Sequence, residues 1–135
     1  MKRYINYSII YSFCAIVGAV FYREFTKFNG FTGKTTLTVV HTHYFLLGMV
    51  FFLIMLLLEK NFKFSNKKTG KLLVAYHIGI NATVIMLIVR GIIQVLNIPL
   101  TKVTSAAVSG VAGIGHIILG VSIVMLLLEV KKSVK

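Results

Sequence analysis

The residues best suited to chemistry in this chain of 135 residues are its four histidines. They are His41, His43, His77 and His116, and each stands in or beside a long apolar stretch. A neutral imidazole can ligate a metal, and ionisable residues inside membrane segments usually mark a functional site. The histidines therefore predict a site for a metal or for a metal-containing cofactor.

Other ligating side chains are scarce. The three acids, Glu24, Glu59 and Glu129, all stand at the ends of apolar stretches, which argues against a carboxylate-rich zinc, manganese or di-iron site. The single cysteine, Cys14, excludes an internal disulfide and any CxxC metal or haem-attachment motif. An all-histidine copper or zinc site and a haem held by two imidazoles both stay open on this evidence.

Four apolar blocks must position these residues. They cover about residues 4–22, 37–58, 72–96 and 105–130, and a helix needs about 20 residues to cross a bilayer. The composition, 57% hydrophobic and 13% charged, leaves no room for a soluble domain. Helices satisfy their own backbone hydrogen bonds in lipid, and none of the blocks alternates as a barrel strand does. We predict an all-α fold, in which residues 1–135 form a single membrane four-helix bundle running up-down-up-down.

Lysine and arginine predict how this bundle is oriented. Ten of the fifteen lie on the side of the two termini and the second connection: Lys2, Arg3, Lys60, Lys63, Lys67, Lys68, Lys71, Lys131, Lys132 and Lys135. Positive residues are retained in the cytoplasm, so both termini are expected there, in a bacterial cytoplasmic membrane. The net charge of +12 then indicates contact with anionic membrane lipid and not with nucleic acid.

The first block has a second interpretation. Lys2-Arg3, the apolar residues after them and the small residues around 17–19 could form a cleaved signal peptide. Cleavage would leave three spans, with the new N-terminus outside. Arg23 and Glu24 directly after the block suit the end of a membrane span equally well.

His116 has the most informative surroundings, in the stretch S-G-V-A-G-I-G-H-I-I-L-G. Gly113 precedes it by three residues and Gly120 follows it by four, so a helix places all three on one face. One interpretation is a close helix–helix contact. The other is a groove in which the missing side chains leave room for a flat ring system beside the imidazole.

The third block adds polar residues inside lipid. Asn81 lies one helical turn after His77 and could hydrogen-bond a neighbour or orient the imidazole. Arg90 costs about 2.5–3.5 kcal/mol at the centre of a span. It could extend to the headgroups, or it could neutralise an anion such as a carboxylate of a bound cofactor.

His41 and His43 project about 200° apart on a regular helix, so only one of them can reach a given centre unless the backbone there is irregular. Gly48 shares a face with His41, which weakly favours His41 as the inward residue. His116 lies about 15–18 Å below the outer surface and His77 about 7–9 Å above the inner one. His116 could therefore pair with His41 or His43, or with His77.

We predict a small b-type haem protein with bis-histidine ligation, serving electron transfer, haem handling or gas sensing. Its candidate site residues are His41, His43, His77, His116, Gly113, Gly120, Arg90 and Asn81. One alternative is a copper, zinc or proton-coupled transport protein that uses the same histidines. Another is a structural subunit without a cofactor. A redox partner or a homo-oligomer is expected, and an independent enzyme is not, because no nucleophile–base or acid pair lies within a span.

The stretch H-T-H-Y-F-L-L-G resembles the H-x-H-x-x-x-x-G motif in an early helix of the haem–copper oxidase catalytic-subunit superfamily. That resemblance implies an axial haem ligand at His41 or His43. The chain is too short for that superfamily's usual subunit and lacks its second, copper-binding set of histidines, so oxidase chemistry is not implied. The whole four-span layout resembles a small bacterial membrane family of unknown function.

Overall fold

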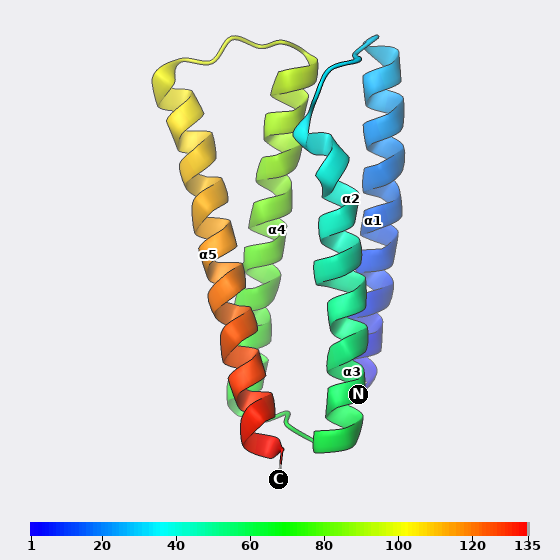
Figure 1. Ribbon diagram of the computed structural model, residues 1–135, viewed down its shortest axis with the longest axis vertical. Coiled ribbons are helices and arrows are strands. Elements are labelled where there is room, and N and C mark those ends of the chain that lie inside the picture. The colour runs from blue at the N-terminus through cyan, green and yellow to red at the C-terminus, as the bar shows by residue number, and fades with distance from the viewer. Residues whose placement is uncertain (135) are drawn as a thin grey trace.

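The computed structural model describes residues 1–134 and folds them into helices that run alternately up and down (Figure 1). Helix α1 spans Lys2–Phe28, α4 spans Lys67–Val95 and α5 spans Lys102–Ser133. The second span is composite. It consists of a 3₁₀ turn η1 (Thr36–Val39), α2 (Val40–His43), a π-helix η2 (Tyr44–Val50) and α3 (Phe51–Phe62).

All four spans are long and apolar enough to cross a membrane, so the chain is a multi-pass membrane protein and the predicted helical bundle is confirmed. Each helix extends several residues beyond its predicted apolar block. Both described ends of the chain lie at one end of the bundle, together with the connection between α3 and α4 (Figure 1). The basic residues predicted to share one side do so, except Lys135, which lies outside the described residues.

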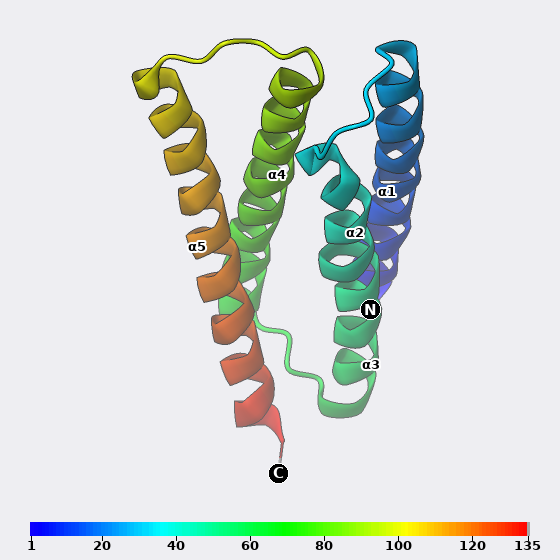
Figure 2. The same ribbon diagram turned by 45° about the horizontal axis from the view of Figure 1, so that its top comes forward.

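The helices form two closely packed pairs. Helix α1 packs on the second span and α4 packs on α5, while α4 also contacts η1 and α2 (Figure 2). Glycines bring α4 and α5 together, because a Cβ at Gly79 would lie 2.6 Å from the Leu119 backbone nitrogen and one at Gly115 would lie 2.9 Å from that of Thr83. The core is centred on large side chains that are fully buried, among them Tyr4, Phe52, Tyr76 and Leu126.

Polar side chains lock the basic end of the bundle around the α3–α4 connection. Asn66 caps α4 by accepting a hydrogen bond from the Thr69 amide, and its own amide donates to Glu129 on α5 at 3.1 Å. Lys68 and Lys132 also donate to Glu129, at 3.0 and 2.8 Å. In the same connection, the Ser65 hydroxyl is hydrogen-bonded to the side chains of Arg3 and Tyr4 of α1. The connection therefore ties α1, α4 and α5 at this end.

Glu129→Ala is expected to lower the thermal midpoint of the purified protein, because it removes the acceptor that joins Asn66, Lys68 and Lys132. The loss should shrink in high salt, which screens ion pairs. Circular dichroism melting checks it. Glu24→Ala is the matched control, since its pair with Arg23 is long, at 3.6 Å, and exposed. Equal losses in the two variants would contradict this account of the basic end.

The opposite end is held less tightly. Thr35 caps η1 by accepting from the Leu37 amide. Its hydroxyl donates to the Gly91 carbonyl, and the Thr36 hydroxyl donates to the Leu87 carbonyl. Pro99 lies in the connection between α4 and α5. Residues 96–107 are all exposed, so nothing in the described chain covers the N-terminal end of α5.

Candidate functional site

The π-helix η2 starts directly after His43 and sets which way the histidine helix faces. A π-turn leaves backbone carbonyls without their usual partners. Two hydroxyls compensate: Tyr76 donates to the Leu47 carbonyl and Ser8 donates to the Met49 carbonyl at 3.1 Å. Gly48 lies against the Tyr11 ring, where any side chain would collide. The irregular segment is thus built from contacts with both α1 and α4.

Tyr76→Phe is expected to destabilise the fold by about 1–3 kcal/mol, because it leaves the Leu47 carbonyl unpaired in a buried setting. The free energy of unfolding in mixed detergent measures the effect. Tyr22→Phe, near the outer end of α1, is the control and should change stability by much less. A Tyr76→Phe protein as stable as the wild type would show that η2 needs no hydroxyl to persist.

His43 and His116 face each other across the gap between α2 and α5. Their ring centres are 6.3 Å apart and the ring planes are nearly perpendicular, at 87°. In each ring Nδ1 is bonded to the carbonyl four residues earlier, Val39 at 2.7 Å and Ala112 at 2.8 Å. Such a bond fixes the tautomer and leaves Nε2 as the ligating atom.

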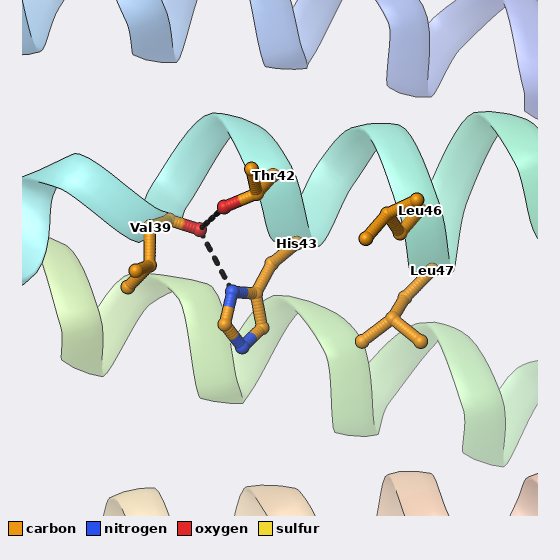
Figure 3. Close-up of a pocket in the computed structure, with 5 residues that line it drawn as sticks. All are labelled: Val39, Thr42, His43, Leu46 and Leu47. Atoms are coloured by element: carbon orange, nitrogen blue, oxygen red, sulfur yellow. Dashed lines mark hydrogen bonds between the residues drawn. The ribbon is translucent and has the colours of Figure 1, made fainter.

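The His43 side of this gap is a pocket of about 290 Å³ lined by Val39, Thr42, His43, Leu46 and Leu47. Figure 3 shows the His43 ring leaving α2, with the nitrogen that is not bonded to Val39 pointing away from that helix, to the side on which α5 lies. The walls are therefore apolar apart from the imidazole and the Thr42 hydroxyl. Thr42 itself bonds back to Val39 at 2.9 Å.

On the α5 side of the gap, glycines lie one helical turn before and after His116. Gly113 and Gly120 both have open space where a Cβ would stand, with no atom within 4 Å. The glycine that makes the close helix contact is Gly115, on the α4 side. Gly113 and Gly120 therefore make no tight helix contact, and the surface of α5 beside His116 is open. That this opening holds a flat ring stays a prediction.

Arg90 lies near the C-terminal end of α4 and contacts α5. Its guanidinium donates to the Ser109 hydroxyl of α5, and Ser109 lies two helical turns, or about 10 Å, above His116. Arg90 is partly buried and has no acid beside it, since all three acids lie elsewhere among the described residues. A fixed positive charge therefore lies near the groove.

His77 belongs to a different cluster, between α4 and α1. Its Nδ1 is 2.7 Å from the Tyr11 hydroxyl, and Asn81 donates to the same hydroxyl at 3.1 Å. Tyr44 in turn donates to the Asn81 side-chain oxygen at 3.0 Å. Asn81 therefore orients the imidazole only through Tyr11. Neither Tyr11 nor Tyr44 was predicted as a site residue from the sequence, because tyrosines in an apolar block give no signal of a shared hydrogen-bond cluster.

His41 takes no part in either group. It is half-buried, and its Nδ1 is buried without a hydrogen-bond partner. Among residues 1–134, no three His, Cys, Asp or Glu side chains lie close enough to bind one metal ion. The four histidines thus form one facing pair, one separate cluster and one isolated residue. The weak preference for His41 as the inward residue agrees with its buried Nδ1, although His43 is the residue that faces His116.

Comparison with known proteins gives a family but no activity. A family described as "Protein of unknown function (DUF2871)" matches residues 1–133. The chain belongs to this family. No curated protein and no solved structure matches the chain. The expected membership of a small family of unknown function is confirmed, and the local likeness to haem–copper oxidases stays a resemblance of one stretch.

Proposed function

We propose that this DUF2871 protein binds one b-type haem between α2 and α5, with His43 and His116 as its axial ligands. One observation carries the proposal: two imidazoles from different helices, each with Nδ1 fixed, stand 6.3 Å apart between ring centres. A metal bound between two imidazole nitrogens at about 2.0–2.1 Å from each separates the ring centres by about 6 Å. The spacing therefore suits a single shared metal centre.

The ligand count favours haem over a free metal ion. A structural zinc ion takes about four protein ligands, and no third His, Cys, Asp or Glu joins the pair within the described chain. A haem iron brings four nitrogens of its own and needs only the two axial ones. Copper bound by two imidazoles is the remaining alternative, and metal analysis separates it from haem.

The rest of the groove supports a flat apolar ring with an acidic edge. Gly113 and Gly120 leave space beside His116, and Leu46 and Leu47 supply apolar walls on the other side. Arg90, above the pair, could neutralise a propionate. Haem bound here supplies one-electron redox chemistry. Because histidine takes both axial positions, the site favours electron transfer to a redox partner over gas binding.

The proposed setting is a bacterial cytoplasmic membrane with both termini inside. The support is the concentration of lysine and arginine at the end of the bundle that holds the termini. Those charges also suit contact with anionic lipid headgroups. A reporter enzyme fused to either end, active only in the cytoplasm, checks this orientation.

The test is a spectrum of the detergent-purified protein expressed with ample haem. Reduced-minus-oxidised difference spectra should show the sharp bands of a six-coordinate low-spin haem at one per chain. Electron paramagnetic resonance should show the strongly anisotropic low-spin signal of perpendicular imidazoles, because the rings stand at 87°. A folded protein that takes up no haem would overturn the proposal, and stoichiometric copper without haem would replace it.

Leucine substitutions on α5 sharpen this test. Gly113→Leu fills the space beside His116 and should reduce haem content at least tenfold. Gly110→Leu is the matched control, since it also has open space around it but lies away from the His116 face. Equal haem content in the two variants would show that the glycine groove does not hold the ring.

A further inference from the structure

We propose a second site, which binds a lipid-soluble quinone in the groove between α1 and α4. This inference is independent of the haem proposal, because it uses different residues on the other side of α4. It starts from the cluster of Tyr11, His77, Asn81 and Tyr44, which the proposed haem site leaves unused.

The hydrogen bonds of this cluster determine which nitrogen of His77 carries the hydrogen. Tyr44 donates to the Asn81 oxygen, so the Asn81 nitrogen must donate to the Tyr11 hydroxyl. The Tyr11 hydrogen is then left for His77 Nδ1, and the hydrogen of the neutral imidazole must sit on Nε2. That Nε2 is buried without a partner. A buried donor of this kind has a desolvation cost that a ligand acceptor can relieve.

A cavity of about 290 Å³ adjoins this donor, and its walls are Tyr7, Ile10, Tyr11, Cys14, His77 and Asn81. The Tyr7 ring stands edge-on to the imidazole, with ring centres 4.4 Å apart. Tyr7 also lines the cavity, so a ligand that accepts from the buried Nε2 requires the Tyr7 side chain to turn aside. The polar lining comes from Tyr7, Tyr11, His77 and Asn81, and the tyrosine rings offer surfaces on which a flat ring can stack.

A second cavity of about 350 Å³ lies farther along α1, and Cys14 lines both cavities. It runs along α1 past Val17, Gly18 and Phe21 and faces Ile88 of α4. Its lining is apolar except for Cys14 and Tyr44. The pair of cavities thus offers a polar end for a ring and an apolar channel for a tail, which is the shape of a lipoquinone.

Depth argues against a phospholipid. Tyr11 and His77 lie about 7–10 Å inside the apolar segments, counted at the rise of a helix. A charged headgroup at that depth has no counter-ion, because the cluster contains only neutral side chains. A quinone ring is neutral, and its carbonyl oxygen can accept from Nε2–H. The tail would then run along the second cavity, farther from the basic end.

Equilibrium binding of a tritiated short-tailed benzoquinone to the purified protein tests the proposal. Wild-type protein should bind saturably at one site per chain. Ile10→Trp should weaken binding at least tenfold by filling the first cavity. Ile9→Trp is the matched control, because Ile9 is a neighbour on α1 that is also exposed and does not line the cavity.

His77→Gln tests the donor, since its amide can still donate from a shorter side chain; it should retain more binding than His77→Leu. Thermal melts identify any variant that fails to fold. Non-saturable binding to the wild type, or equal binding to the two tryptophan variants, would overturn the site. Displacement of the probe by phospholipid or sterol, but not by unlabelled quinone, would overturn the choice of ligand.

Discussion

His116→Leu should abolish the low-spin haem spectrum while the protein still folds and melts as the wild type does. The side chain is exposed and its one hydrogen bond is to the carbonyl of its own helix, so the fold loses little. The iron loses an axial ligand, and at this groove no other imidazole stands near enough to replace it. Haem content per chain, measured as the pyridine complex after purification, should fall at least tenfold.

His41→Leu is the control for that result, because the sequence alone could not choose between His41 and His43. His41 is half-buried and its Nδ1 has no partner, so the variant should keep both its stability and its haem. His43→Leu should behave as His116→Leu does. If the His41 variant alone lost its haem, His41 would be the ligand in place of His43, and the assigned pair would be refuted.

Gly79→Ala should strongly destabilise the bundle. An added methyl group would stand 2.6 Å from the Leu119 nitrogen and 2.8 Å from its Cα, and neither backbone atom can move without separating α4 from α5. Overpacking of this kind costs about 1–3 kcal/mol. Equilibrium unfolding in mixed detergent micelles measures the loss.

Gly110→Ala serves as the comparison, since a Cβ there meets nothing within 4 Å. Alanine suits a helix better than glycine, so this variant should be neutral or more stable by roughly 0.5–1 kcal/mol. If the two alanine variants unfolded alike, the close approach of α4 to α5 at Gly79 would be absent in the folded protein.

The membrane spans were predictable because lipid imposes a simple rule on length and composition. The four apolar blocks match the observed helices, the third block passing the end of α4 by one residue, and Thr35 caps the second span as its side-chain chemistry suggests. The π-helix at Tyr44–Val50 was not predictable. It depends on hydroxyls of Ser8 and Tyr76, which come from other helices and are distant in the sequence.

The candidate site was predictable in its residue types and less so in its pairing. Glycines beside His116 indicated space, and the structure has that space. The partner could not be chosen, because His41 and His43 point in opposite directions and the rotation of their helix is set by packing. His77 looked like a further ligand in the sequence, but its contact with Tyr11 arises only when α1 and α4 come together.

The basic end of the bundle is tied by Asn66, Ser65 and Glu129, whereas the far end of α5 is uncovered. This asymmetry bears on biogenesis. Because its helices are joined by hydrogen bonds at one end and lie apart at the other, the chain can be inserted into the membrane and can fold before any prosthetic group binds. Under the proposed function, haem would then enter sideways from the bilayer, and maturation would require no unfolding of the finished polypeptide.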